Sequence, residues 1–160
     1  MARYNMELAR NLKVESVCRL RPTPPWQLAP DRPVSEAIAL MRQCRVGCLL
    51  ICQGESLVGI FTERDLMRRV LAAGKALTAP VGLYMTPDPV TVGLKEPINL
   101  ALKLMEQGGY RHLPVIDVCG RPVGVLSVKR IVHYLAEHFP ATIYNLPPDP
   151  NIFPLHAEGA

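Results

Sequence analysis

The sequence predicts a mixed α/β (α+β) fold built from one small unit that the chain uses twice. At a constant offset of 64, residues 33–53 match residues 97–117 at Pro33/Pro97, Ala37/Ala101, Leu40/Leu104, Met41/Met105, Gln43/Gln107 and Leu49/Leu113. One inserted residue later, GIFT at 59–62 falls on GVLS at 124–127. The chain has 160 residues, of which 49% are hydrophobic, enough for a shared core. We therefore expect two small sheets packed together, with flanking helices and a pseudo-two-fold axis.

Each copy opens with a short extended segment and a predicted amphipathic helix. The extended segments lie near residues 26–28 and 90–92. Residues 34–44 carry apolar side chains at i, i+3, i+4 and i+7, and residues 98–107 repeat this pattern. Each of these helices follows a proline, a residue that suits the first turn of a helix.

Two strands and a second helix complete each copy. The short apolar runs 48–51 and 113–116 predict buried strands. In both copies a turn follows, and then a second strand, at 57–61 in the first copy and 122–126 in the second. A second helix opens directly after each of these strands. Each copy therefore has the order strand, helix, strand, strand, helix.

The chain divides into four parts along its length. These are an N-terminal arm at 1–13, a first repeat at 14–79, a second repeat at 80–139 and a proline-rich tail at 140–160. The prolines of the tail favour an extended backbone over a helix. Apolar residues in the tail predict that it docks on another surface; they are Ile143, Tyr144, Leu146, Ile152 and Phe153.

The composition narrows the classes of partner. A net charge of +4 suits a small anionic ligand or an acidic partner, and it is too small to indicate nucleic acid. No stretch approaches the ~18 apolar residues that a membrane span needs. The first residues also lack the apolar core of a signal peptide. We therefore expect a cytoplasmic protein without a nucleic-acid or membrane partner.

The five cysteines are an odd number in a chain without an export signal, which predicts reduced thiols. Cys44 ends a predicted helix, whereas Cys48 and Cys52 lie in a predicted strand. This spacing does not place the three thiols on one face, so we expect core packing and no metal site.

The segment Thr62-Glu63-Arg64-Asp65 joins a strand to a helix and allows two interpretations. The first is helix capping, with Thr62 as N-cap and Asp65 three residues later, a variant of the capping box. The second is ligand binding, because a helix start exposes unpaired N–H groups and a carboxylate there can accept hydrogen bonds from a ribose diol. Capping and binding are compatible with each other.

The phrases GIFTERDLMRRV and RHLPVID…GRPVGVLS carry a family resemblance. The duplicated unit resembles the cystathionine β-synthase (CBS) domain pair, or Bateman module, of the stand-alone bacterial type, over about Val14 to Phe139. The resemblance implies a flat module with two clefts on its pseudo-two-fold axis. It also implies adenosine-containing ligands, a regulatory role and dimerisation into a disk.

The resemblance also implies roles for single residues in one intact cleft. Asp65 matches the ribose-binding aspartate of the family, and Thr62 matches its hydroxyl partner. From the second repeat, Arg111 and His112 match a basic pair of the AMP-activated protein kinase γ subunits, and Lys129 matches a phosphate-contacting lysine.

The adenine ring would lie beside the backbone of the first repeat, near Val46, Gly47 and Ile60. In the second repeat Arg130 stands where the family has its aspartate, and an arginine cannot accept from a diol. Gly47 and Cys48 stand where the basic pair would be for that cleft. The resemblance therefore implies one nucleotide site and one degenerate site.

Each site residue also has an interpretation without a ligand. Arg111 can be a solvated arginine, and His112 a histidine at the edge of the core. Lys129 and Arg130 can be exposed on the first turn of a helix, although cations are unfavourable at that end. Arg64, Arg68 and Arg69 are expected on a solvated helix face or a dimer rim.

The sequence therefore predicts a regulatory module that binds AMP, ADP or ATP in one cleft and acts as a homodimer. No catalytic constellation is present in the sequence, so we expect no enzymatic activity, no catalytic residue and no required cofactor. The alternatives are a ligand-free dimerisation or docking module for an unidentified protein target, and a binder of S-adenosylmethionine.

Overall fold

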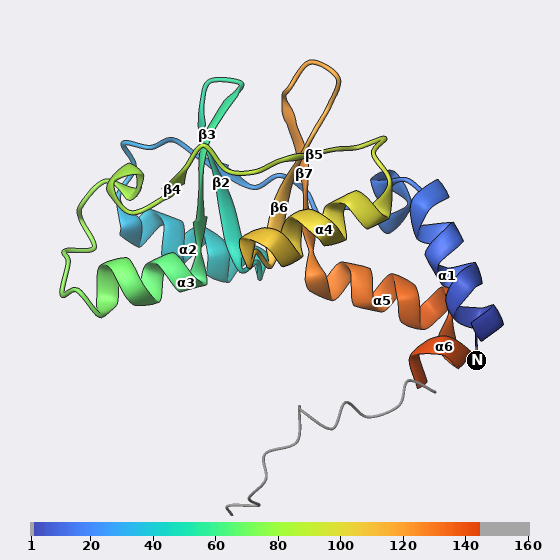
Figure 1. The fold of residues 1–160 in the computed structure, drawn as a ribbon. Helices are drawn as coiled ribbons and strands as arrows, with labels where there is room; N and C mark the ends of the chain where they lie inside the picture. Colours follow the sequence, from blue (N-terminus) through green and yellow to red (C-terminus); the bar gives the residue numbers. More distant parts are fainter. Residues whose placement is uncertain (1, 145–160) are drawn as a thin grey trace, which may run out of the picture.

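The first half of the fold contains the first predicted repeat and the segments beside it. The computed structural model describes residues 2–144 (Figure 1). Its first elements are helix α1 (Ala2–Val14), the 3₁₀ turn η1 (Val17–Leu20), strand β1 (Gln27–Leu28), helix α2 (Val34–Cys44), strands β2 (Cys48–Gln53) and β3 (Ser56–Thr62), the short helix α3 (Glu63–Asp65) and its π-helical continuation η2 (Leu66–Leu71).

The second half repeats this order. Its elements are the 3₁₀ turn η3 (Val81–Leu83), strands β4 (Thr86–Pro87) and β5 (Val92–Gly93), helix α4 (Ile98–Gly108), strands β6 (His112–Ile116) and β7 (Pro122–Ser127), and helices α5 (Val128–His138) and α6 (Pro140–Tyr144). One sheet has the order β1-β2-β3-β4 and the other the order β5-β6-β7. The predicted fold class, with two small sheets and flanking helices, is confirmed.

The two sheets use the same pairing. β1 runs parallel to β2, and β5 runs parallel to β6, whereas β2/β3 and β6/β7 are antiparallel hairpins. Leu49 pairs with Phe61 in one hairpin and Leu113 with Leu126 in the other, and all four side chains are almost fully buried. The turns of both hairpins point to the top of Figure 1, and the helices of both repeats lie below them.

Helices α2 and α4 end in the same way but with different residues. The residue after each helix is left-handed, Arg45 with φ 54° and Gly109 with φ 65°. Glycine adopts this conformation freely, whereas an L side chain costs about 1 kcal/mol or more. The first repeat therefore has Arg45 at a left-handed position where the second repeat has Gly109, the residue type that this conformation favours.

The core of each repeat includes residues from the segment that leads into the other repeat. We call residues 16–23 and 80–87 the lead-in segments. Val17 is fully buried in the core of the second repeat, and Val81 is fully buried in the core of the first. The lead-in segments also extend the hairpins, since Thr23 pairs with Val125 of β7 and β4 pairs with β3. The two repeats are therefore interlocked.

The two sheets meet through a third apolar cluster between the repeat cores. Four of its buried residues come from the first repeat and Val125 comes from the second; they are Cys48, Leu50, Cys52, Ile60 and Val125. The predicted boundaries at 14, 80 and 140 stay predictions. The interlocked segments cross them, so each core contains residues from both predicted repeats.

Both ends of the described chain lie beside the second repeat. α1 occupies the predicted N-terminal arm and contacts α4 and α6. The tail prediction is wrong at its start, because residues 140–144 form the helix α6 and not an extended segment. A proline is tolerated in the first turn of a helix, where its missing N–H has no partner to lose. Leu146, Ile152 and Phe153 lie outside the described residues.

Gly124 allows the first lead-in segment to approach β7. A β-carbon at this position would lie 2.9 Å from Cβ of Pro22 and 3.1 Å from the carbonyl oxygen of Thr23. These neighbours are a proline ring and backbone, which cannot move aside without breaking the Thr23–Val125 pairing. Gly124→Ala should therefore lower the free energy of unfolding by ~1–3 kcal/mol in urea unfolding followed by circular dichroism.

Gly47→Ala is the matched control for this substitution. A β-carbon at Gly47 would meet its nearest neighbours at 3.5 Å, an ordinary contact distance. Its unfolding curve should stay close to that of the wild type. Equal stability of the wild type and Gly124→Ala would show that the close approach of the first lead-in segment to β7 does not stabilise the fold.

Candidate functional site

The predicted capping box is present at the start of α3. The Asp65 backbone N–H donates to the Thr62 hydroxyl at 3.2 Å, and the Thr62 backbone N–H donates to Oδ2 of Asp65 at 3.0 Å. The Thr62 hydroxyl in turn donates to the same Oδ2 at 2.7 Å. Both side chains are therefore fixed by reciprocal hydrogen bonds at the point where β3 becomes a helix.

The other carboxylate oxygen of Asp65 has weaker partners. The hydroxyl of Thr86 donates to Oδ1 at 3.3 Å, and Nε of Arg69 lies 3.4 Å from the same oxygen. Arg69 is also tied to the second lead-in segment, because it donates to the carbonyl oxygen of Met85 at 2.7 Å. Asp65 is only 7% exposed. Its Oδ1 keeps acceptor capacity, since a carboxylate oxygen offers about two lone-pair sites and both contacts are long.

Asp65 lines a cleft of about 620 Å³ between the two repeats, which we call the Asp65 cleft. Six of the predicted site residues line it together; they are Gly47, Ile60, Thr62, Asp65, Arg111 and His112. The first four come from the first repeat and the last two from the second. The structure therefore joins the carboxylate and the predicted basic pair in one cleft.

The basic pair is positioned by the start of β6. The carbonyl oxygen of Arg111 accepts from the N–H of Val128, and the equivalent Gly47 carbonyl accepts from the N–H of Glu63, both at 3.0 Å. These bonds hold the first residues of each hairpin against the following helix. Arg111 is exposed, and its side chain makes no ion pair or hydrogen bond within residues 2–144.

His112 lies between the two clefts of the module. Its ring is 3.5 Å from the place that a β-carbon of Gly47 would occupy, next to the Glu63 carboxylate. Burial lowers the pKa of His112, and Arg111 acts in the same direction, whereas Glu63 opposes them. The imidazole is therefore mainly neutral near pH 7.

Lys129 and Val46 do not line the Asp65 cleft, which corrects the predicted residue set. Both line the other cleft, which has a volume of about 1150 Å³ and which we call the second cleft. The repeat explains the difference. Lys129 precedes Arg130 just as Arg64 precedes Asp65; Arg64 and Asp65 line the Asp65 cleft, whereas Lys129 and Arg130 line the second cleft.

Sequence reasoning missed several residues of the Asp65 cleft. Arg64 and Arg69 were expected on a solvated face, yet both line this cleft, together with Thr86 and Asp88. The repeat offset could have placed Arg64 there, as the counterpart of Lys129. Nothing in the sequence indicates Thr86, because the lead-in segment reaches Asp65 only after the repeats interlock.

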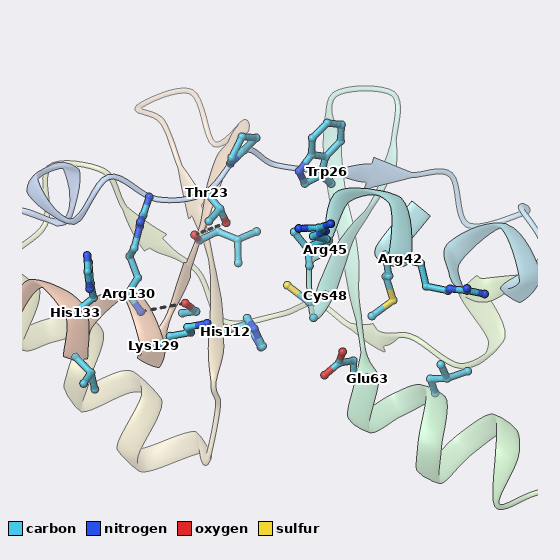
Figure 2. Close-up of a pocket in the computed structure, with 18 of the residues that line it drawn as sticks. Thr23, Trp26, Arg42, Arg45, Cys48, Glu63, His112, Lys129, Arg130 and His133 are labelled. Carbon is cyan, nitrogen blue, oxygen red and sulfur yellow. Dashed lines mark hydrogen bonds between the residues drawn. The ribbon is translucent and has the colours of Figure 1, made fainter. Parts of the chain in front are cut away.

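The second cleft has a different chemistry. Figure 2 shows Lys129 and Arg130 on one side, Arg45 on the other, Trp26 above and Glu63 below. Nε of Arg130 donates to the carbonyl oxygen of Arg21 at 2.9 Å. Arg130 thus occupies the position of Asp65 without offering an acceptor, as the sequence predicts.

The cysteines are all free thiols, and Cys48 lies in the wall of the second cleft. Burial raises the pKa of the Cys48 thiol to about 12, with Glu63 as a smaller cause. The thiol therefore stays protonated and a weak nucleophile at neutral pH. Within residues 2–144, no group of three or more His, Cys, Asp or Glu side chains is placed to hold a metal ion.

Two interlocked α/β repeats with a cleft on either side of their shared wall define a tandem-repeat module with two clefts. The chain belongs to the CBS domain family, since the sequence model of the CBS domain matches residues 16–72 and 81–137.

Curated relatives are similar in sequence over the same region. The CBS domain-containing protein CBSCBSPB3 of Arabidopsis thaliana is 38% identical over 108 residues, which are 66% of this chain and 19% of that protein. The "Uncharacterized 17.7 kDa protein in bps2 3'region" of Acidianus ambivalens is 30% identical over 122 residues, 76% of this chain and 73% of that protein. The chain therefore spans about a fifth of the Arabidopsis relative.

Solved structures show the same fold. The crystal structure of the CBS domain of NE2398 has a TM-score of 0.70 and 30% identity, covering 75% of this chain and 96% of that one. The CBS domain protein PAE2072 from Pyrobaculum aerophilum, complexed with AMP, has a TM-score of 0.69 and 26% identity, covering 77% and 99%. In the described part of this chain, the helices are too short or too polar to traverse a bilayer.

The lowered pKa of His112 makes stability depend on pH. The unfolded chain takes up a proton on this residue near pH ~6.5, whereas the folded protein does so only at lower pH. The unfolded state therefore binds more protons in this window, and the free energy of unfolding decreases as the pH falls through it. His112→Gln should weaken this decrease in urea unfolding at about pH 7.5 and about pH 5.

His133→Gln is the control, because the His133 side chain is 64% exposed and its 3.2 Å contact with Glu137 lies on the surface. This variant should lose stability with falling pH as the wild type does. An equally steep loss in His112→Gln and the wild type would show that His112 is not the titrating group.

Proposed function

We propose that this protein is a regulatory module that senses an adenosine-containing nucleotide, AMP, ADP or ATP, in the Asp65 cleft. One observation carries the proposal. A buried carboxylate, fixed by the capping box, borders the same cleft as an unpaired arginine from the other repeat. A nucleoside monophosphate is recognised by such a pair of groups, an acceptor for its ribose diol and a cation for its phosphate.

Asp65 binds the ribose through Oδ1 in this proposal. Oδ2 already accepts from the backbone and the hydroxyl of Thr62, so it serves to orient the carboxylate. A ribose hydroxyl displaces the long contact from Thr86 at little cost, because a 3.3 Å hydrogen bond from a neutral group is weak.

Arg111 and Arg64 bind the phosphate end, and the backbone near Gly47 and Ile60 borders the adenine. Arg64 is exposed and already reaches across the cleft, with Nη1 3.5 Å from the carbonyl oxygen of Gly109 in the second repeat. A phosphate offers this guanidinium a better acceptor than that carbonyl, because charge-assisted bonds are shorter and stronger. His112 stays neutral, so it contributes a ring wall and no further positive charge.

A ligand in this position contacts both repeats, which is the basis of the regulatory role. It shifts the module toward whatever arrangement of the repeats binds it better. The AMP complex of PAE2072, which shares 26% of its residues with this chain, supports AMP as the first ligand to test. S-adenosylmethionine has the same diol and lacks the phosphate, so it tests whether the cations matter.

Calorimetric titration with AMP should detect binding to the wild type and a loss of at least about tenfold in affinity in Asp65→Ala. This loss corresponds to one charge-assisted hydrogen bond to the diol, ~1.5–3 kcal/mol. Arg111→Ala removes an exposed side chain that makes no ion pair or hydrogen bond within the described residues. It should lower the affinity for AMP and leave the affinity for adenosine unchanged, because adenosine has no phosphate.

Asp31→Ala is the matched control, because Asp31 is an exposed aspartate outside both clefts. It should bind AMP like the wild type. Circular dichroism of unliganded Asp65→Ala separates a lost site from a lost fold. If AMP, ADP, ATP and S-adenosylmethionine all fail to bind the folded wild type, the proposed function is wrong.

A second observation favours self-association, as the homodimer proposal requires. Four apolar side chains are exposed on η2 and α5: Met67 (60%), Leu71 (50%), Val128 (38%) and Val132 (52%). Both segments lie along the lower edge of the molecule in Figure 1. A dimer interface along this edge would cover these side chains and remove their apolar surface from water.

The combined variant Leu71→Lys and Val128→Lys, at residues that line neither cleft, should shift the protein from dimer to monomer in analytical ultracentrifugation. A pair of lysines adds repulsion across a symmetric interface and removes apolar area. Leu83→Lys, at a residue that is 70% exposed on η3, serves as the control. A monomeric wild type at micromolar concentration would contradict the homodimer.

A further inference from the structure

The second cleft carries far more positive charge than the Asp65 cleft. Arg42, Arg45, Lys129 and Arg130 line it, and Glu63 is the one carboxylate among its lining residues. The Asp65 cleft has three arginines and three carboxylates in its lining, which balance each other. The module therefore places most of its excess charge in the cleft that has lost the ribose-binding carboxylate.

These cations have few partners in the protein. Within residues 2–144, the side chains of Arg42, Arg45 and Lys129 make no ion pair and no hydrogen bond. Arg130 uses its Nε for the carbonyl oxygen of Arg21, and this bond leaves its terminal nitrogens free. Cations that converge on a cleft repel each other, and an anion between them removes the repulsion.

The positions of these cations are otherwise unfavourable. Lys129 and Arg130 lie in the first turn of the eleven-residue helix α5, where the helix dipole disfavours positive charge. Arg45 occupies a left-handed position whose counterpart in the second repeat is Gly109. The backbone and the helix would both be more stable with other residues, so a contribution to ligand binding explains these three better than a contribution to stability.

We propose that the second cleft binds a chain of phosphate groups, either as an inorganic oligophosphate or as the phosphate tail of a nucleoside triphosphate. Arg45 and the pair Lys129 and Arg130 stand on opposite sides of the cleft (Figure 2). In this proposal a chain of phosphates contacts the cations on both sides, whereas a single phosphate contacts those of one side. Guanidinium groups suit phosphate oxygens because they bind them in a bidentate manner. This site requires no diol acceptor and does not depend on the proposed AMP site.

Trp26 makes this cleft observable by itself. It is the one tryptophan of the chain, it is 41% exposed, and it lines the second cleft but not the Asp65 cleft. Titration of the whole protein with tripolyphosphate, followed by Trp26 fluorescence and by calorimetry, should give saturable binding. The variant Arg45→Ala with Lys129→Ala should bind at least tenfold more weakly, because it removes a cation from each side.

The matched control is Arg68→Ala with Lys103→Ala, which removes the same charge from exposed positions outside both clefts. It should bind tripolyphosphate like the wild type, and so should Asp65→Ala. Gln in place of Ala at 45 and 129 provides a second test if the alanine variant fails to fold. An ATP-induced change of Trp26 fluorescence that Arg45→Ala with Lys129→Ala removes, in parallel with that of tripolyphosphate, identifies a nucleoside triphosphate as a second source of the phosphate chain.

Three outcomes would overturn the proposal. The first is equal weakening in the control and the cleft variant, which indicates unspecific charge attraction. The second is orthophosphate binding as tightly as tripolyphosphate, which leaves no role for a chain. The third is no calorimetric or fluorescence response of the wild type to tripolyphosphate. Loss of AMP binding in Asp65→Ala with tripolyphosphate binding unchanged keeps the two sites experimentally separate.

Discussion

The interlocking of the two repeats is the constraint on which the rest of the structure depends. Val17, from the segment before the first repeat, is fully buried in the core of the second repeat. Val81, from the segment before the second repeat, is fully buried in the core of the first. A repeat unit of this size buries only enough apolar surface for marginal stability by itself. The exchanged segments supply the missing core residues and extend both hairpins. They also bring Thr86 to Asp65 and hold Arg69 through the carbonyl oxygen of Met85, so the same interlock that stabilises the fold builds part of the wall of the Asp65 cleft.

The duplication gives two clefts with one backbone plan and two different chemistries. Thr62 and Ser127 cap their helices in the same way, each accepting from the backbone N–H three residues later. That N–H belongs to Asp65 in one repeat and to Arg130 in the other. A single change of side chain at one helix start therefore converts an acceptor for hydroxyl groups into a donor for anions. The chemical divergence lies in these side chains, and the shared wall of Gly47, Glu63 and His112 stays common to both clefts.

The capping box and the proposed binding role of Asp65 reinforce each other. The helix start needs an acceptor for its free N–H groups, and Oδ2 provides it. This use fixes the carboxylate and leaves Oδ1 facing weaker donors. A ligand then meets a group that is already oriented, so little conformational entropy is lost on binding. The structural and the functional interpretations of this motif are therefore two uses of one side chain.

Much of the fold followed from the sequence, because it depends on local patterns that recur at a fixed offset. The apolar stripe of residues 34–44 and its copy at 98–107 gave helices at nearly those bounds, and the hairpins lie where the apolar runs predicted them. The grouping of Asp65 with Arg111 and His112 was also predictable, through the resemblance and the repeat symmetry. The start of the tail was not, because a proline at 140 is compatible with a helix whose first turn it occupies.

The sequence by itself determined the duplicated unit, the capped helix start and the replacement of the second aspartate by Arg130. Each of these depends only on neighbouring residues or on a constant offset between the repeats. Only the tertiary structure decided which cleft each basic side chain lines. Lys129 lies 64 residues from Asp65 and faces the second cleft, whereas Thr86 reaches Asp65 through the interlocked segment. Contacts between distant residues depend on how the two sheets meet, and no local pattern specifies that.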